Sequence, residues 1–270
     1  FELQCTATAA LPQSEVIGSQ FCEVQGIRGA GQWDLGWGWH MATQFMADAY
    51  EAGDPRKNAT LLYFRKSDDE PITPENTNEP YGESPVSPAM GAYFNKKAYT
   101  DPALRKEYTN KGFWVNIRLI RYSDVVLMAA EAYNETENTA EAWKLLNSVR
   151  RRAGAREITT ENYQELMKEK VYKLRFISDS DDAGKFRTAL FWERGFELAF
   201  EGQRKYDLIR WGIIKDALSL FGNRSEVNTS TTTAYPAGEN FQKGKHELFP
   251  IPLDELQLNP LLENKNNPNY

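Results

Sequence analysis

The amino-acid sequence predicts a mainly α-helical fold, built from helix-turn-helix pairs that are decorated with long irregular loops and a few short strands. Two observations predict it. From residue 116 onward, apolar residues recur at spacings of three and four, which is the period of an amphipathic helix. Before residue 116 neither a helical nor a strand period persists beyond a few positions, and six of the thirteen prolines fall between Pro71 and Pro102.

A single domain over residues 1–270 is expected, because a chain of 270 residues with 41% hydrophobic content can bury a substantial core. We divide it into a loop-rich binding part (1–115), the helical pairs (116–215) and a C-terminal wrap (216–270). The C-terminal tail within the wrap, residues 246–270, contains several prolines, so we expect at most one short helical turn in this tail and expect it to pack back over the helices.

The loop-rich part contains two expected elements before its prolines begin. Residues 14–26 suit a strand, and residues 41–53 suit a helix that Gly53 closes. Residues 71–102 are expected to form a loop. A structureless stretch of that length in a compact domain is usually functional, and the tyrosines within it favour a contact surface.

The helical part contains four expected helices in two pairs. Residues 116–135 and 139–154 form the first antiparallel pair, and its second helix starts on Thr139 as N-cap and ends on a glycine. The second pair covers residues 159–176 and about 188–211, again followed by a glycine. Two such pairs in succession resemble a fragment of a helical solenoid.

Composition and charge exclude several classes of function. The net charge of -6 and the pI near 5.2 argue against a surface that neutralises nucleic-acid phosphates. The longest apolar run, residues 125–130, is far shorter than the roughly 20 residues needed to cross a bilayer. The beginning of the chain lacks the basic start and the apolar segment of a targeting signal.

No cofactor and no metal site is expected. With only His40 and His246 and no Cys-x-x-Cys spacing, the zinc-binding patterns are absent. The acidic loop 178–184 could hold calcium, but it lacks the alternating ligands of an EF-hand, and a solvated loop is favoured. Cys5 and Cys22 could form one disulfide or remain free.

One stretch, residues 193–212, interleaves eight charged residues with four aromatic residues. As a single amphipathic helix it would place Glu193, Glu197 and Glu201 on one face. Two of these carboxylates could serve as the acid and base of a glycoside hydrolase. The interpretation that we favour is structural: arginines of this helix and of residues 150–152 pair with the glutamates, so that Glu and Arg atoms lie within about 4 Å.

Two glycines inside this stretch need a reason. Gly195 and Gly202 lie seven residues apart, on the same side of the expected helix. Because each costs about 1 kcal/mol of helix propensity relative to alanine, we expect another backbone to come close at both positions.

Several separated motifs occur in an order that is typical of one protein family. In chain order they are GWGW (36–39), TQFMADAYEAGDPR (43–56), IRYSDVVLMAAEAYNE (120–135), LLNSVRRRAG (145–154), ERGFELAFEGQRKYDLIRWG (193–212), LFPIPLDELQLNPLL (248–262) and NPNY (267–270). With them the chain resembles the SusD/RagB family, the glycan-binding outer-membrane lipoproteins of Bacteroidetes. The family's usual ending has Gly before the last Tyr; this chain has Asn269, which also tolerates a left-handed backbone.

The resemblance implies a SusD-like α–α superhelix and a non-enzymatic protein that binds oligosaccharides on the outer surface of the outer membrane. It implies delivery of the ligand to a SusC-like TonB-dependent transporter. Family members also begin with tetratricopeptide-like helices and a lipid-anchored cysteine, which do not appear here, so the chain resembles the C-terminal part and Cys5 is not expected to be lipidated. Three alternatives stay open: a peptide-binding component of such an importer, a glycoside hydrolase that uses Glu193 and Glu197, and a structural helical scaffold that recruits the transporter.

Sugar recognition favours exposed aromatic faces that are flanked by polar side chains. The best candidate is the segment GAGQWDLGWGWH, residues 29–40, in which Trp33, Trp37 and Trp39 are separated by glycines. In an extended strand Trp37 and Trp39 would face the same side; the alternative is that both belong to the core. The remaining candidates for ligand contact are Tyr81, Tyr93, Asp34, Asn76, Asn78 and Asn95. The tryptophans expected in the core are Trp143, Trp192 and Trp211.

Overall fold

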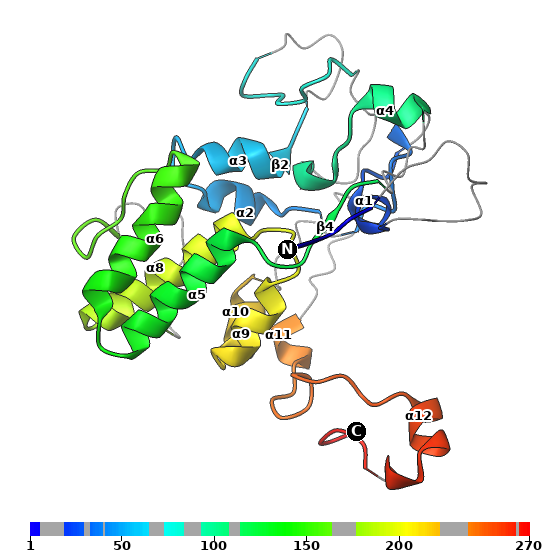
Figure 1. Cartoon of the computed structure of the whole chain (residues 1–270), viewed down its shortest axis with the longest axis vertical. Helices are drawn as coiled ribbons and strands as arrows, with labels where there is room; N and C mark the ends of the chain where they lie inside the picture. The colour runs from blue at the N-terminus through cyan, green and yellow to red at the C-terminus, as the bar shows by residue number, and fades with distance from the viewer. Residues whose placement is uncertain are drawn as a thin grey trace. The chain divides into compact units, whose positions relative to one another are not determined.

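The chain folds as a mainly helical protein, as the sequence predicts (Figure 1). The computed structural model describes residues 1–5, 19–29, 33–39, 41–64, 73–83, 93–107, 114–163, 177–221, 237–262 and 265–270. Two compact units can be separated. The first comprises residues 1–204 with 226–228, and the second comprises residues 205–225 and 229–270.

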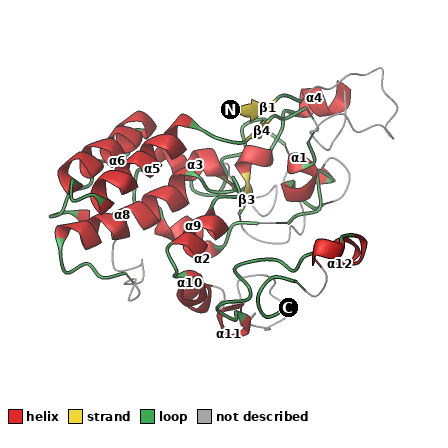
Figure 2. Cartoon of the chain, turned by 60° about the horizontal axis from the view of Figure 1, so that its bottom comes forward, coloured by secondary structure: helices red, strands yellow, loops and turns green. Residues whose placement is uncertain are grey.

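Three long helices form the helical part of the first unit. They are α5 (Tyr122–Glu135), α6 (Thr139–Ala153) and α8 (Asp182–Glu197), and they pack side by side in both views (Figures 1 and 2). The predicted antiparallel pair is therefore confirmed as α5 and α6. The apolar side chains buried between these helices include Leu127, Ala130, Leu146, Phe186 and Leu190.

The ends of these helices follow local sequence signals, with one difference. The side chain of Asn138 accepts a hydrogen bond from the backbone N–H of Glu141 and caps α6, whereas Thr139, the expected cap, is the first residue of the helix. Gly154 ends α6 in the left-handed conformation (φ 75°), as expected. The first helix of the other expected pair, over residues 159–176, lies almost entirely outside the described residues.

The acidic loop 178–184 contains the N-cap of α8. Asp181 is its N-cap, and the side-chain oxygen of Asp181 accepts a hydrogen bond of 2.7 Å from the backbone N–H of Gly184. Within the described part of the chain, no group of three or more metal-ligating side chains comes together. The loop therefore has a structural reason for its aspartates.

The expected helix through residues 193–212 is wrong in its middle. Helix α8 ends at Glu197, residues 198–203 form turns, and α9 (Arg204–Arg210) begins afterwards. The break occurs where Phe200 (φ 64°) and Gly202 (φ 81°) adopt left-handed backbone angles, which no α-helix can continue.

The two glycines of this stretch also differ from expectation. A Cβ added at Gly195 would meet the guanidinium group of Arg204 at 3.6 Å, which is a side chain and not another backbone. Gly202 has no atom within 4 Å of such a Cβ among the described residues, so its requirement is the positive φ alone.

Short helices replace the strand expected over residues 14–26. The described part of that segment forms α1 (Phe21–Gln25), while residues 14–18 lie outside the described residues. Helix α2 (Gln44–Ala49) confirms the middle of the helix expected over 41–53, but it ends at Ala49 with an extended Tyr50 as its C-cap, so Gly53 does not close it. Helix α3 (Pro55–Thr60), with Asp54 as its cap, was not predicted as a separate helix.

Among the described residues, four two-residue strands confirm the prediction of few and short strands. Strand β1 (Glu2–Leu3) pairs antiparallel with β4 (Ile117–Arg118), and β2 (Leu61–Leu62) pairs antiparallel with β3 (Phe94–Asn95). After β3 follow the 3-10 helix η2 (Lys96–Ala98) and α4 (Pro102–Glu107), so the loop expected over 71–102 ends in regular structure. The small core beneath this part consists of Ile27, Trp33, Leu35, Leu62 and Phe94.

The second unit is made of short helices. In the described residues they are α9 from residue 205 onward, α10 (Ile214–Phe221), α11 (Ala237–Asn240), α12 (Leu253–Leu258) and the 3-10 helix η3 (Pro260–Leu262). Within the tail 246–270, α12 and η3 together form more helix than the single turn that we expected there. Asn269 adopts the left-handed conformation (φ 67°) that its replacement of glycine requires. None of the helices in the described ranges has the length and apolar character to span a membrane.

Candidate functional site

Two neighbouring tryptophans form the most exposed aromatic surface of the predicted site. Trp37 and Trp39 are 40% and 57% exposed. Their ring centroids lie 5.3 Å apart, with the planes inclined at 59°. We call these two residues the tryptophan pair; their side chains meet each other and still present ring surface to solvent.

The backbone beneath the tryptophan pair is fixed to helix α1. The N–H of Trp37 donates to the carbonyl of Glu23 at 2.7 Å, and the N–H of Trp39 donates to the carbonyl of Val24 at 3.0 Å. Between them, the N–H of Gly38 donates to the carbonyl of Gly26 at 2.9 Å. The last carbonyls of a helix have no partner within it, so this segment both satisfies the end of α1 and holds the two rings in place.

The glycines between the tryptophans permit this close approach. A Cβ at Gly36 would overlap the carbonyl oxygen of Glu23 and would lie 2.9 Å from the Cα of Gly26. Gly38 has a φ of 71°, so the extended strand expected for this segment is wrong at that residue. The two rings nevertheless come together, because the left-handed residue between them bends the backbone.

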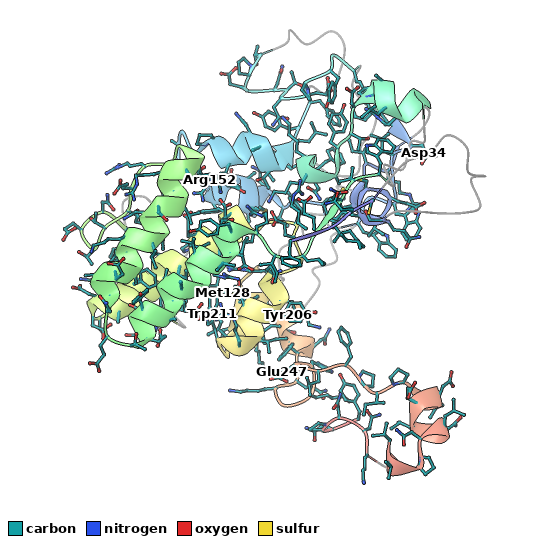
Figure 3. The ribbon with its side chains drawn as sticks, in the orientation of Figure 1. Asp34, Met128, Arg152, Tyr206, Trp211 and Glu247 are labelled. Atoms are coloured by element: carbon teal, nitrogen blue, oxygen red, sulfur yellow. The ribbon has the colours of Figure 1, made fainter. Side chains whose placement is uncertain are left out.

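Trp33 and Asp34 have different environments from the tryptophan pair. Trp33 is only 3% exposed and packs in the core against Phe64 and Tyr99, with centroids at 5.0 and 6.2 Å. Its ring therefore has no free face in this structure. Asp34 is exposed (Figure 3) and forms an isolated backbone bridge with Arg28.

Tyr81 is a second exposed aromatic residue, supported by a polar cluster that the sequence did not reveal. It is 47% exposed, and its ring lies 5.7 Å from that of Tyr99. The carboxylate of Glu79 accepts hydrogen bonds of 2.8 Å from the backbone N–H groups of Tyr81 and Glu83 and one of 2.7 Å from the hydroxyl of Tyr99. Glu83 also accepts from Tyr99 and pairs with Arg105. The cluster fixes the segment that carries Tyr81.

The hydroxyl of Tyr99 serves as a hydrogen-bond donor in this cluster. Burial raises its pKa far above the usual tyrosine value, and the hydrogen bonds to Glu83 and Glu79 raise it further. From sequence, only the spacing of the glutamates around Tyr81 could have indicated this cluster. Tyr99 follows β3 and η2 and lies 16 residues after Glu83, so no local pattern connects it with the glutamates.

Two of the predicted asparagines are engaged within the fold. The Asn78 side chain accepts from the N–H of Tyr63 at 2.9 Å and donates to the carbonyl of Leu61 at 2.6 Å, which ties residue 78 to β2. Asn95 is 3% exposed; its amide donates to the side chain of Gln25 at 2.8 Å, and its oxygen caps η2. Both amides hold segments together in this structure.

The last two predicted positions lie beside the same part of the chain. Tyr93 is half-buried, with its ring 5.8 Å from that of Tyr63 in an edge-on arrangement. The Asn76 oxygen accepts from the N–H of Thr73 at 3.1 Å and closes a turn. The structure thus leaves the tryptophan pair and Tyr81 as the predicted aromatic residues with the most open ring surface.

The glutamates of the charged stretch pair with arginines of residues 150–152, as predicted, whereas Arg194 of their own helix binds Asp124 at 2.8 Å. Glu193 is 1% exposed and binds Arg56 of α3 and Arg150 of α6, the latter at 2.7 Å. Arg56 also binds Asp54 at 2.7 Å. The charged groups of one helix therefore meet partners from two other elements within the fold.

Glu197 and Glu201 extend the same network. Glu197 binds Arg152, on α6 (Figure 3), and Arg121, the latter at 2.9 Å. Glu201 binds Arg121 and Lys97, both at 2.6 Å. We call the carboxylates of Glu193, Glu197 and Glu201, with their cationic partners, the ion-pair network.

The surroundings of Glu197 oppose a role as a general acid. Burial alone raises its pKa, but the hydrogen bond from Arg121 and the charges of Arg121, Arg152 and Arg56 outweigh burial and hold the pKa below the usual glutamate value. A general acid at neutral pH needs the opposite shift. The geometry therefore favours the structural interpretation of this glutamate.

The cysteines and the other tryptophans are also located. Cys5 and Cys22 are both free thiols. Trp192 is buried, as expected, while Trp143 and Trp211 are half-buried.

Comparison with known proteins identifies the family and several relatives of this chain. The model of the SusD family matches residues 12–270. SusD-like protein P25 of Formosa agariphila is 37% identical over 144 residues, 53% of this chain and 22% of that protein. SusD-like protein P2 of the same organism is 28% identical over 251 residues, 92% of this chain and 44% of that protein. The chain spans less than half the length of either relative.

A solved structure shows the same fold. A laminarin binding SusD-like protein aligns with a TM-score of 0.62 and 23% identity, covering 100% of this chain and 49% of that one.

Proposed function

The chain belongs to the SusD family, and from this premise we propose that it binds oligosaccharides without catalysis at the outer surface of the bacterial outer membrane. In this proposal the bound glycan passes to a SusC-like TonB-dependent transporter for import. The full-length protein is held at the membrane by a lipid anchor outside these 270 residues.

The observation that carries the proposal is the tryptophan pair. Sugar rings present C–H groups that pack on aromatic faces, and a rigid, exposed aromatic surface binds them with little loss of side-chain freedom. Three backbone hydrogen bonds to α1 fix the segment on which both rings stand. Exposed Tyr81 is the second aromatic contact that we propose, and exposed Asp34 supplies a carboxylate for sugar hydroxyls.

The ligand class follows the family and its solved relatives. The similar structure described above is of a protein that binds laminarin, a glucan. Laminarin oligosaccharides are therefore the first probes for this chain. Because net gains per hydrogen bond to a polar ligand are small, we expect dissociation constants between about 1 μM and 1 mM.

The absence of catalysis in the proposal is supported by the ion-pair network. Its carboxylates are bound by arginines from α3 and α6, and Glu197 has a lowered pKa. A glycoside hydrolase needs one carboxylic acid that stays protonated until it donates. Release of product from reporter glycosides, abolished by Glu197→Gln, would replace the proposal with that alternative.

Isothermal titration of the chain with laminarihexaose and a panel of neutral and charged oligosaccharides tests the proposal. Trp37→Ala and Trp39→Ala should each weaken glycan binding about tenfold, because each removes an aromatic face of the kind that contributes roughly 1 to 2 kcal/mol. Tyr133→Ala is the matched control, since Tyr133 is 42% exposed and lies on α5.

The outcomes separate the alternatives. If Tyr133→Ala loses as much glycan affinity as Trp37→Ala and Trp39→Ala, the glycan does not bind at the tryptophan pair. Binding of peptides, with no binding to any glycan, would make the chain a component of a peptide importer instead.

A further inference from the structure

A small pocket lies in the first unit, between α1, β4 and the turn that follows α8. Its volume is about 190 Å³, below the roughly 300 Å³ of pockets for drug-sized ligands but enough for about six waters at ~30 Å³ each. The residues that line it are Phe21, Gln25, Asn116, Ile117, Arg118, Phe200, Glu201 and Gly202. We call it the Arg118 pocket. Its size suits a single sugar unit, and its lining combines aromatic rings with polar groups.

The two charged residues of the pocket do not neutralise each other. Both oxygens of Glu201 are occupied, one by Lys97 and the other by Arg121, each at 2.6 Å. Arg118 is half-buried on β4 and, within the described ranges, has neither an ion pair nor a side-chain hydrogen bond. The charge left over in the pocket is therefore positive.

The acidic and thiol groups nearest to Arg118 do not supply the missing charge. Glu2 is its partner across the β1–β4 pair, but the carboxylate of Glu2 accepts from the amide of Asn116 at 3.0 Å and forms no ion pair with Arg118. Cys22 lies near enough to feel the arginine charge, but burial raises the pKa of its thiol to about 12, so it stays neutral. A half-buried guanidinium that has no carboxylate partner within the described residues is available to the oxygens of an anionic ligand.

A second residue with a donor group, Gln25, lines the same pocket. The oxygen of the Gln25 side chain accepts from Asn95 at 2.8 Å, which orients the amide. Its NH2 group has no acceptor among the residues that the structure describes. A guanidinium and an amide N–H on one pocket make a set of donors for the oxygens of an anion.

The aromatic wall of the pocket is held in a strained conformation. Phe200 has a φ of 64°, which is rare for a bulky residue and persists only where the surroundings impose it. The turn that imposes it is fixed at its start by Lys97, whose ammonium group donates to the carbonyl of Ala199 at 2.9 Å. Phe21 of α1 also lines the pocket. A pocket lined by two phenyl rings and by the donor groups of Arg118 and Gln25 suits a sugar ring that carries an acidic group.

We propose that the Arg118 pocket binds a sugar unit bearing an anionic group, a carboxylate or a sulfate ester, with Arg118 and Gln25 on the anionic oxygens and Phe21 and Phe200 on the ring. The inference rests on the proposed function and gives it a substrate class: glycans that contain charged units. The pocket is separate from the tryptophan pair, which carries no cation and recognises ring faces irrespective of charge.

Matched ligand pairs test the proposal by isothermal titration. Trigalacturonate is compared with its neutral methyl ester, and a sulfated carrageenan tetrasaccharide is compared with its desulfated form. The anionic member of at least one pair should bind about tenfold more tightly or better, as expected for a charge-assisted hydrogen bond. Whichever pair shows the preference identifies the anionic group.

Variants assign the preference to the pocket. Arg118→Gln should abolish it, whereas Arg151→Gln should leave it unchanged, since Arg151 is exposed on α6 and pairs with Glu157. Phe200→Gly keeps the backbone conformation without strain and should weaken binding of the ester and the acid alike. Thermal melting of each variant shows that it is folded.

Each outcome decides between the two proposals. An anionic preference that survives Arg118→Gln, or no preference in either pair, overturns the pocket assignment, even if laminarihexaose still binds and is lost in Trp37→Ala. Equally tight binding of triglutamate would assign the pocket to acidic peptides and overturn it too. Failure of every glycan to bind overturns the pocket and the proposed function together.

Discussion

Replacing Gly36 by alanine tests whether the close approach to α1 builds the tryptophan pair. The added Cβ would overlap the carbonyl oxygen of Glu23 and lie 2.9 Å from both the Cα and the N of Gly26, and all of these are backbone atoms that cannot rotate away. Either the segment stays and the overlap costs about 1 to 3 kcal/mol, or it moves and loses its three hydrogen bonds to α1, at about 0.5 to 1.5 kcal/mol each.

The chain adopts the less costly of these two responses, so we expect Gly36→Ala to lower the free energy of unfolding by about 1 to 3 kcal/mol. Urea denaturation at pH 7 measures this loss directly. If the segment moves, the contact between the rings of Trp37 and Trp39 changes, and the near-ultraviolet circular dichroism of the variant changes with it.

A matched glycine separates this steric effect from backbone preference. Gly53 has a φ of 87° with no atom within 4 Å of an added Cβ among the described residues, so Gly53→Ala should cost only about 1 to 2 kcal/mol for the left-handed conformation. It should leave the near-ultraviolet spectrum unchanged. A Gly36→Ala variant with wild-type stability and spectrum would refute the claim that α1 positions the tryptophans.

Three further predictions concern buried polar groups. Glu197 has a lowered pKa in the folded state, so its stabilising effect is complete above the ordinary glutamate pKa and is lost as pH falls through the lowered value; Glu197→Gln should cost about 3 kcal/mol at pH 7 and flatten the decline of stability measured by urea denaturation between pH 5 and 3. Asn78→Ala should cost about 1 to 3 kcal/mol, because it leaves the N–H of residue 63 and the carbonyl of residue 61 without their partner, and wild-type thermal stability would contradict this. Iodoacetamide at pH 8 should modify half-exposed Cys5 while sparing buried Cys22, whose pKa is about 12, and equal modification by mass spectrometry would show that residue 22 is accessible.

The long helices could be predicted from sequence because their signals are local. Helix α6 has an apolar stripe, an asparagine or threonine at its start and Gly154 at its end, and each of these acts within one turn of the helix. The pairing of Glu193 with arginines was also predictable. Its helix carries apolar residues on every side of the charge, and a buried carboxylate requires a cationic partner.

The turn after α8 was not predictable in the same way. Residues 198–200 continue the helical spacing of apolar side chains, and only Gly202 signals a break. The left-handed Phe200 is imposed by contacts from elsewhere, including the ammonium group of Lys97 on the carbonyls of residues 197 and 199. A residue about 100 positions away in the chain ends this helix, and no window of local sequence contains that information.

The exposure of the individual tryptophans also could not be predicted from the sequence. Trp33 and Trp37 have similar flanking residues, with glycines and a leucine near both, yet one is 3% and the other 40% exposed. The difference arises from Phe64 and Tyr99, which reach Trp33 from other segments, and from α1, whose carbonyls accept the backbone N–H groups at residues 37–39. Burial of a ring is a property of what packs on it, and that is decided at the tertiary level.

The ion-pair network explains why charge is so concentrated after residue 192. Its cations come from α3, from η2, from α6 and from Arg121, the N-cap of α5, so four elements of the loop-rich and helical parts are joined to the end of α8. Short helices and two-residue strands cannot bury enough apolar surface to fix their own positions, and buried ion pairs with defined geometry can fix them instead. Against this background the one half-buried arginine of the neighbouring pocket stands apart: the same region that supplies partners for Arg56, Arg121 and Lys97 supplies none, among the described residues, for Arg118. That contrast is the reason to assign Arg118 to a ligand and the network to the fold.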